Sequence, residues 1–406
     1  MTTGTDKPDK LGFTIFLLCC GYFVDFYDLT IFAASYTQVI QNLFQIYNPI
    51  EIQSLYLTIT NFYTAGIILG AITFGIIGDK FGRSYVIRYS ILIYSTAIIL
   101  SIFAKSIILF TILRFVAGFG LATEFATSSV LLAELLGTRQ AANSTKWLYC
   151  SGILGGITAV FISRIFPWQF VFICGGAAGI IIFILRKKIL ESVLFKLLTP
   201  TISRGNFFKL FANRTQTLKL IKLFILIVPF NFIISVMFML PNFMPISLKL
   251  GHAIQILLTG FFLGNLVSTF ASSYIINYFK DYRVYCWLNI ALFLIVVPLF
   301  RFIPDNFFFI YCLFIGLLGG GLPTVWIQLI SRSYPTEIRN TASNTLWAMG
   351  RGSGIIFNLL CLVWITNKSL FIYSITVSSL VIASLVIIVL LNTKNNYNNA
   401  LNQIES

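Results

Sequence analysis

The stretch GDKFGRSYVIR, residues 78–88, is a short charged interruption between two long apolar runs. Gly78 and Gly82 permit a tight turn and a close approach of the flanking segments. Asp79 carries a charge that is favourable near a helix N-terminus, and it can also pair with Arg83 or with an arginine of another loop. A solvated turn with ordinary membrane-anchoring cations would have a similar composition. The rest of the chain separates these two interpretations.

The loop has a second copy in the other half of the chain. Arg83 is matched about 200 residues later by Arg283 in NYFKDYR (277–283), and Arg139 is matched by Arg339 at the same offset. The second copy lacks both glycines. Two halves that each return the chain to the same side of a membrane have parallel topology, and such repeats place a substrate site between them near mid-membrane.

The composition indicates a membrane protein. Only 10% of the 406 residues are charged and 58% are hydrophobic, whereas a soluble domain carries about 25% charged residues. The net charge of +15 does not indicate nucleic-acid binding, because Lys and Arg lie in short gaps between apolar runs. The sequence contains no Walker loop, metal-type spacing or nucleophile–base pattern, so we expect neither an enzyme nor a resident cofactor or metal.

We therefore predict an all-α integral membrane protein with twelve spanning helices in two pseudo-symmetric six-helix bundles. The bundles are residues 1–186 and 220–406, the second ending in a short polar tail, and a cytoplasmic loop over 187–219 joins them. The predicted spans are 11–36, 52–77, 85–104, 107–134, 142–164, 168–186, 220–246, 253–278, 284–302, 307–331, 341–365 and 369–391.

The distribution of basic residues predicts the orientation. Lys and Arg concentrate in the gaps on one side of the predicted spans and are scarce on the other side. The positive-inside rule then places both termini and the central loop in the cytoplasm. No small-residue cleavage site follows the first apolar run, so we interpret that run as a retained helix in the cell (inner) membrane.

Five charged residues fall well inside the predicted spans: Asp25, Asp28, Arg114, Glu124 and Arg351. A charge at the bilayer centre costs about 2.5–3.5 kcal/mol on insertion scales, so each is a candidate functional residue. Asp25 and Asp28 lie within about 60° of each other on the first helix. We expect that face to point to the cleft between the bundles.

Two roles are open for these charges. Apolar surroundings favour the neutral form of a carboxylate and a nearby arginine favours its charged form, so a carboxylate between both influences can bind and release a proton. Asp25 is the leading candidate for proton coupling, assisted by Asp28 and Glu124. A static ion pair with Arg351 or Arg114 is the alternative. The two arginines either bind an anionic substrate or serve as partners of the carboxylates.

The loop GDKFGR resembles the signature loop of the major facilitator superfamily. The twelve spans, the repeat of six and the long central loop extend this resemblance over essentially the whole chain. LRFVAGFGLATEFATSSVLLAELLGTRQAAN (113–143) and SYPTEIRNTASN (333–344) resemble two further signatures of the superfamily. RKKILESVLF (186–195) is similar to the start of the central loop in its metabolite:proton symporter and sugar-porter branches.

The resemblance implies that the two bundles work by alternating access. It also implies that the signature loop acts as a conformational latch between them. The residues of this sequence on which that role falls are Gly78, Asp79, Gly82, Arg83, Arg139, Arg283 and Arg339.

We expect a secondary active transporter, with proton symport of a small polar organic solute into the cytoplasm as the favoured function. The two central arginines favour an organic acid or a zwitterion over a neutral sugar. Its partners are then the small-molecule substrate, protons and the lipid bilayer, and we expect a monomer.

Two alternatives stay open. The first is proton-coupled efflux of a carboxylate-rich metabolite or metal chelator. SGILGG (151–156) has Gly152 where drug exporters of the superfamily often have proline, which favours uptake. The second is a solute receptor that does not transport, although the short tail and the central loop of roughly 30 residues do not resemble an output domain.

Overall fold

The computed structural model describes residues 8–136, 138–198, 204–239, 250–279, 281–299, 307–364 and 368–391. This part of the chain is almost entirely helical and contains no strand. The side chain of Arg139, the first seven residues and the tail after 391 lie outside the described residues. The predictions that fall on them therefore stay predictions.

Helices of the first half make six spans, of which the fourth consists of two helices in succession. They are α1 Pro8–Phe44, α2 Pro49–Phe81, α3 Arg83–Ser101, α4 Ile107–Leu121, α5 Glu124–Leu135, α6 Thr138–Ile165 and α7 Trp168–Leu185. Short helices follow in the central loop: η1 Arg186–Lys188, α8 Val193–Leu197 and η2 Phe207–Phe211.

The second half repeats this pattern, with its fourth span again divided in two. Its helices are α9 Arg214–Met239, α10 Leu250–Phe279, α11 Tyr282–Leu299, α12 Phe308–Gly319, α13 Gly321–Ser333, α14 Arg339–Trp364 and α15 Lys368–Leu391.

Each predicted span coincides with one of these helices or helix pairs. Within the described residues, nine stretches are long and apolar enough to cross a membrane, and shorter apolar helices cover Tyr282–Val296 and Ile375–Leu391. The remaining span is α14, which carries Arg351. The predicted twelve-span helical fold is confirmed.

Local sequence decides where several helices begin. Asn48 precedes α2 and accepts a hydrogen bond from the N–H of Ile50 at 3.0 Å, with Pro49 at the first helical position. Ser106 caps α4 in the same way, through the N–H of Leu109 at 3.2 Å.

Small residues decide where two spanning helices approach closely. A Cβ atom on Gly66 of α2 would lie 2.2 Å from the carbonyl oxygen of Phe115 in α4, and one on Gly118 of α4 would lie 2.2 Å from the carbonyl oxygen of Tyr63. The backbones of α2 and α4 are therefore in contact, which only glycine permits at these positions.

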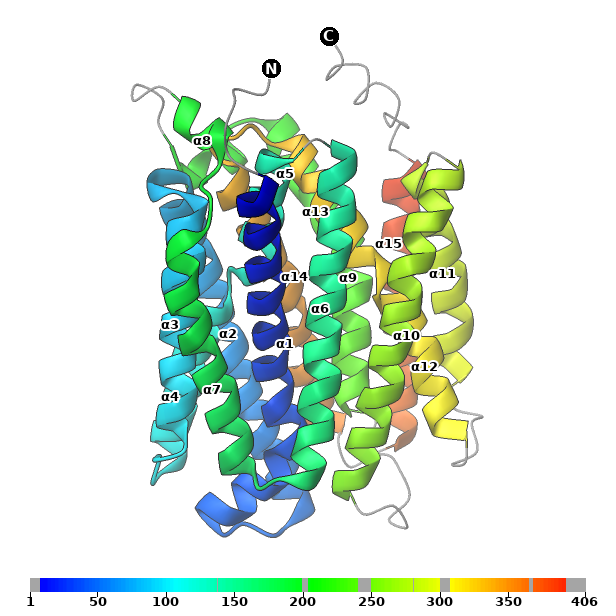
Figure 1. Cartoon of the computed structure of the whole chain (residues 1–406). Helices are drawn as coiled ribbons and strands as arrows, with labels where there is room; N and C mark the ends of the chain where they lie inside the picture. Colours follow the sequence, from blue (N-terminus) through cyan, green and yellow to red (C-terminus); the bar gives the residue numbers. More distant parts are fainter. Residues whose placement is uncertain are drawn as a thin grey trace.

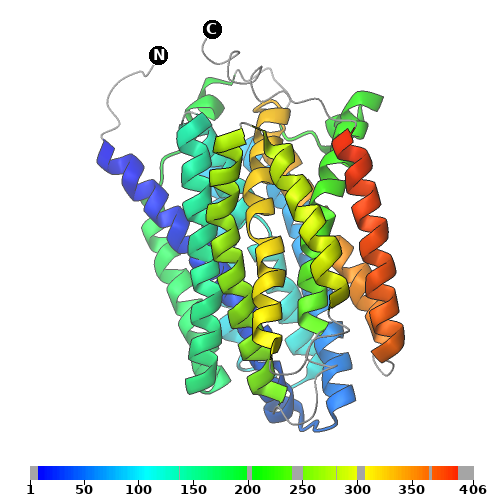
Figure 2. The same cartoon turned by 90° about the vertical axis from the view of Figure 1, so that its right-hand side faces the viewer.

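The two halves lie side by side with their helices along a common direction (Figures 1 and 2). α2 packs against α14 and α6 against α10, so the second span of each half contacts the fifth span of the other. This reciprocal pairing agrees with the repeat in the sequence. α8, the described start of α1 and the described end of α15 lie at the same end of the molecule, at the top of Figure 1. We call it the loop end.

Candidate functional site

A cavity lies between the two halves and holds about 950 Å³ free of protein atoms, its open mouth included. α1, α2 and α4 line it from the first half, and α9 and α14 from the second. Apolar and aromatic side chains form most of the wall, and Thr60, Thr64, Asn231 and Ser235 add polar atoms. Small-molecule sites have this kind of lining.

Aromatic rings from both halves fill the space between the cavity and the loop end. Trp347 of α14 lies in the cavity wall, one turn closer to the loop end than Arg351. Its ring centroid is 4.9 Å from that of Phe125 in α5, 5.7 Å from Trp326 in α13 and 6.2 Å from Phe230 in α9. Ring contacts at these distances are favourable, and they join the two halves on this side of the cavity.

Arg114 of α4 reaches the cavity between two rings. Its guanidinium carbon lies 5.0 Å from the ring centroid of Phe32 and 4.7 Å from that of Tyr63. The side chain is buried, yet Nε and Nη1 have no hydrogen-bond partner within the described residues. Buried donors in proteins are nearly always paired, so these two N–H groups are available to a ligand.

Arg351 of α14 lines the same cavity from the second half. Its guanidinium carbon lies 5.3 Å from the ring centroid of Trp347, and its Nη1 is buried without a hydrogen-bond partner in the described part of the chain. The structure thus brings one predicted arginine from each half to a single cavity. Both are stacked on aromatic rings, and both retain donors for an anion.

Asp25 and Asp28 do not line the cavity, although we expected their face of α1 to point to the cleft. Their neighbours Phe26 and Leu29 occupy the cavity wall instead. The two aspartates are sealed from it, with exposed fractions of 1% and 0%. None of their four carboxylate oxygens has a hydrogen-bond partner among the described residues.

The arginines of the cavity are nevertheless the opposing charges with the largest electrostatic effect on these carboxylates. Arg351 is the charge that acts most strongly on Asp25, and Arg114 is the charge that acts on Asp28. Neither pair approaches within ion-pair distance in the described structure. A charge in such a place is poorly compensated.

Glu124, at the start of α5, is engaged in a buried ion pair with Arg186 at the end of α7. Arg186 donates through Nη1 to Oε2 at 2.8 Å and through Nη2 to Oε1. It also donates to the carbonyl oxygens of Ile87 at 2.8 Å and Leu17 at 3.5 Å. Glu124 therefore differs from Asp25 and Asp28: its charge is matched in this conformation.

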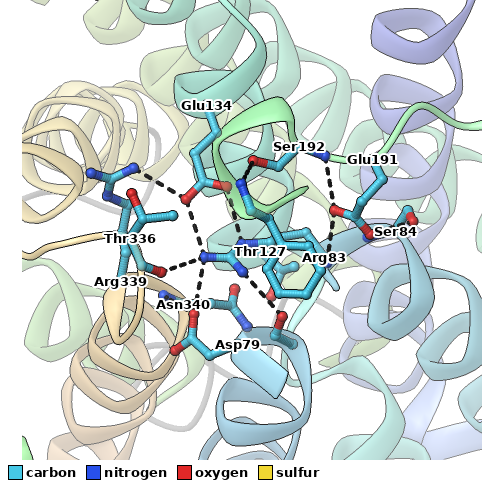
Figure 3. A network of polar contacts seen from close by, with 12 residues as sticks. Asp79, Arg83, Ser84, Thr127, Glu134, Glu191, Ser192, Thr336, Arg339 and Asn340 are labelled. Atoms are coloured by element: carbon cyan, nitrogen blue, oxygen red, sulfur yellow. Dashed lines mark hydrogen bonds and ion pairs between the residues drawn. The ribbon is translucent and has the colours of Figure 1, made fainter. Parts of the chain in front are cut away.

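The signature loop meets the start of α14 at the loop end (Figure 3). Asp79 accepts hydrogen bonds from the backbone N–H groups of Asn340 at 3.2 Å and Thr341 at 2.8 Å, and from the Thr341 hydroxyl at 2.7 Å. It also forms an ion pair with Arg83 at 3.0 Å. Both roles considered for Asp79, at a helix N-terminus and as the partner of an arginine, are present together.

Arg83 and Glu134 extend this network across the two halves (Figure 3). Arg83 donates to the carbonyl oxygen of Thr336 at 2.6 Å and forms an ion pair with Glu134 at 3.1 Å. Glu134 also pairs with Arg339 at 3.1 Å. The side chains of Arg83 and Glu134 are fully buried, so this carboxylate lies between two arginines with little water to screen it.

Each of the two glycines of the signature loop is required for a different structural reason. Gly82 has a φ of 113°, which side chains rarely adopt. A Cβ on Gly78 would lie 2.1 Å from Nδ2 of Asn340, so glycine lets α14 approach. Beside the loop, Glu191 of the central segment accepts hydrogen bonds from the N–H of Ser84 at 3.1 Å and its hydroxyl at 2.6 Å.

The other predicted latch residues differ in their contacts. Arg339 belongs to the network, whereas Arg283 forms its ion pair with Asp281 of its own loop at 2.8 Å. Arg139 cannot be placed, because its side chain lies outside the described residues. No three His, Cys, Asp or Glu side chains of the described chain are placed to share a metal ion.

The sequence profile of the Major Facilitator Superfamily matches residues 18–252, more than half of the chain. The chain belongs to the major facilitator superfamily. A Haemophilus influenzae superfamily relative named for metabolite transport is 26% identical over 309 residues, which are 71% of this chain and 74% of that protein. The sialic acid transporter NanX of Escherichia coli is 24% identical over 298 residues, 72% of this chain and 71% of its own length.

Solved structures of the major facilitator superfamily share the fold. The proton:xylose symporter XylE, solved with 6-bromo-6-deoxy-D-glucose, superposes with a TM-score of 0.73 over 94% of this chain and 95% of its own. Its sequence identity is 15%, so the similarity concerns the fold. The relatives and neighbours of this superfamily member are transporters, not enzymes.

Sequence reasoning missed Arg186, Glu134 and Glu191 as site residues. Arg186 directly follows an apolar run and resembles an ordinary boundary cation. Glu134 and Glu191 stand inside two stretches that resembled superfamily signatures, and this was the available signal. Their partners come from other helices, and spacing along the chain carries no information on such contacts.

Proposed function

We propose that this superfamily member is a proton-coupled importer of a small organic acid or zwitterion. One observation carries the proposal: Arg114 and Arg351, from opposite halves, line one cavity with buried N–H groups that lack partners in the described structure. An anion bridging both arginines would contact both halves at once, which is what a substrate of an alternating-access transporter has to do.

The wall of the cavity supports an organic anion over an inorganic one. Rings of Phe32, Tyr63 and Trp347 lie against the two guanidinium groups and leave apolar surface for a carbon skeleton. A relative named for the transport of sialic acid, a carboxylic acid, agrees with this class.

The unpaired carboxylates support proton coupling. Asp25 and Asp28 are buried and have no hydrogen-bond partner among the described residues, and the counter-charges that act most strongly on them are the two arginines proposed to hold the substrate. Protonation of the aspartates removes the competing negative charge and favours the binding of an anion to the arginines. Proton and substrate would then be bound and released together.

We further propose that residues 1–186 and 220–406 move as two units and that the loop end faces the cytoplasm, with both termini on that side. The loop end is closed by the network around Asp79, Arg83 and Glu134, and Trp347 separates the cavity from it. In this arrangement the cavity would receive solute from outside. We propose a monomer, because each chain holds one complete cavity.

A ligand screen on the purified protein tests the substrate class. Thermal stability is measured with N-acetylneuraminate, nicotinate, benzoate, succinate and glycine betaine, with xylose as the neutral comparison. A true ligand at 100 times its dissociation constant stabilises the protein by about 2.7 kcal/mol. Stabilisation by xylose alone would contradict the proposal.

Transport of the stabilising acid into proteoliposomes tests the coupling. An inwardly directed proton gradient should drive accumulation, and Asp25→Asn should abolish it while counterflow exchange continues. Glu51→Gln, on the exposed start of α2, serves as the control. Accumulation driven only by an oppositely directed gradient would indicate efflux, and binding without any flux would indicate a receptor.

A further inference from the structure

A column of buried polar side chains runs along the interior of the first half, beside the cavity. Gly21, Asp25 and Asp28 lie on one face of α1 over about 10 Å, at 1.5 Å per residue. Gly175, Gly179 and Arg186 lie four and seven residues apart, on one face of α7 and at its end. α1 and α7 pack against each other, and Gly175 of α7 lies against Asp28 of α1.

Glycines on the two helices allow the polar atoms of the column to lie close to the helix backbone. A Cβ on Gly175 would lie 2.1 Å from Oδ1 of Asp28, and a Cβ on Gly179 would lie 1.9 Å from Oγ of Ser95. At the other end, a Cβ on Gly21 would lie 1.6 Å from Nη2 of Arg186. The column thus begins at Asp28 and ends at the Arg186 side chain with its partner Glu124.

Hydroxyl groups from α3 lie between these ends. Oη of Tyr94 and Oγ of Ser95 are fully buried and have no hydrogen-bond partner among the described residues. Asp25, Asp28 and Glu124 are all close enough to act electrostatically on Tyr94. Several unpaired buried groups in one place indicate bound water or exchangeable protons, because each orphaned group alone is costly.

We propose that Asp28, Asp25 and Glu124 form a proton path inside the first half, beside the substrate cavity, with Arg186 as the gate at its loop end. This proposal rests on the proposed proton coupling and adds the route that the proton takes. Asp28 is the entry, because it lies one helical turn farther from the loop end than Asp25 and its neighbour Leu29 lines the cavity. The proposed function gives no role to Arg186 or to its bond with Glu124, and the path gives them one.

Each step transfers one proton between oxygens and leaves all electron pairs in place. Water that enters from the cavity when the seal around Asp28 opens gives a proton to the Asp28 carboxylate and becomes hydroxide, which bulk solvent neutralises. Asp28 passes the proton through a hydroxyl of α3 or a water to Asp25, and Asp25 passes it to Glu124. Glu124 releases it to water at the loop end.

Arg186 controls the last step. While it donates to both oxygens of Glu124, both proton-accepting atoms of that carboxylate are engaged by the guanidinium group. Arg186 is followed closely by Glu191, which holds the start of α3 beside the signature loop. Opening of the loop end moves this segment, and the gate therefore opens with the latch.

The charged and titratable side chains around the path come from several helices. The charged and titratable side chains that act on the column, or are acted on by it, are Cys20, Tyr22, Tyr27, Tyr63, Tyr94, Arg114, Arg186 and Arg351. Only two of the basic ones, Arg114 and Arg351, line the cavity. Arg186 is thus the one cation of this set that substrate does not reach.

Infrared difference spectroscopy of the full chain in liposomes tests the path with the proton itself as the probe, so no substrate is required. Titration between acidic and alkaline pH should show protonated-carboxyl bands that disappear in Asp25→Asn and Asp28→Asn, each substitution shifting the titration of the other band. Independent titration would overturn the path. Bands that respond to sodium instead of pH, with choline as the comparison, would assign the site to a cation and also overturn it.

The hydroxyl and gate variants complete the test. Tyr94→Phe should shift both aspartate bands, whereas Tyr36→Phe, whose buried hydroxyl bonds Gln53 elsewhere in this half, should not. Arg186→Gln should add a Glu124 band that is absent from Arg186→Gln/Glu124→Gln. The double variant removes the charge pair together, which protects folding. A spectrum without the added band would refute the gate, and because no transport is measured, this result is independent of the proposed function.

Discussion

Asp79 of the first half accepts a hydrogen bond from the N–H of Thr341, in the first turn of α14 of the second half, at 2.8 Å. A carboxylate here satisfies helix N–H groups that have no partner within their own helix and also interacts favourably with the helix dipole. In the proposed alternating access, the contact exists only while the loop end is closed. Its energy therefore stabilises one conformation over another more than it stabilises the fold.

Asp79→Asn should shift the protein toward conformations with an open loop end. A charge at a helix N-terminus contributes about 0.3–1 kcal/mol, and up to about 2 kcal/mol when partly buried. We expect the open population to rise by a factor of up to roughly 30. Spin labels at the exposed positions Tyr85 on α3 and Trp287 on α11 would report the change as a longer inter-label distance.

The second copy of the loop supplies the control for this substitution. Asp281 bonds Arg283 in its own loop and has no hydrogen bond or ion pair with the first half among the described residues, so Asp281→Asn removes a carboxylate of the same kind without breaking an inter-half bond seen there. Its distance distribution should match that of the unsubstituted protein. Equal shifts in the two variants would show that the bond from Asp79 to α14 does not hold the loop end closed.

Glycine to alanine substitutions on α1 should separate packing from helix propensity. At Gly21 a Cβ would lie 1.6 Å from Nη2 of Arg186, so Gly21→Ala should displace the Arg186–Glu124 pair and destabilise the protein by about 1–3 kcal/mol. Gly12 has nothing within 4 Å of its Cβ position, and Gly12→Ala should be neutral or stabilising by up to about 1 kcal/mol. Thermal unfolding in detergent measures both, and a smaller loss at Gly21 than at Gly12 would contradict the packing.

The sequence predicted the spans well because a hydrophobic run of sufficient length has one stable arrangement in a bilayer. The ends were less accurate. α1 continues to Phe44, beyond the predicted end at 36, and α9 begins at Arg214, before the predicted start at 220. Helical hydrogen bonding continues past the apolar part of a helix, and composition does not register this extension.

The site was only partly predictable for a different reason. A buried charge is recognisable within a run, so Asp25, Arg114 and Arg351 could be found one at a time. Their partners could not, because contacts such as Asp79 with Thr341 join residues about 260 positions apart. The sequence offered Asp79 a helix N-terminus or an arginine, and only the packing of the halves shows that it has both.

Glu134→Gln should open the loop end more strongly than Asp79→Asn. Glu134 lies between Arg83 and Arg339, each at 3.1 Å, and its loss leaves two cations facing each other in a buried place. Removing one partner of a buried pair costs about 3–5 kcal/mol. Glu337→Gln breaks the partly exposed pair with Lys209 and should cost at most about 1 kcal/mol. The Tyr85–Trp287 distance and the unfolding temperature should rank the variants in this order, and a reversed order would refute it.

Arg351→Lys should weaken binding of the organic acid that stabilises the protein. Lysine keeps the charge but loses the planar group that lies 5.3 Å from the Trp347 ring centroid and presents several N–H donors. A hydrogen bond to a charged group contributes about 1.5–3 kcal/mol, so the dissociation constant should rise by roughly 10- to 150-fold. Arg88→Lys is the matched control, because Arg88 stacks on Phe183 at 5.2 Å and lies outside the cavity lining. Calorimetric titration of both variants decides the matter: equal affinities would mean that Arg351 holds helices together and does not bind the substrate.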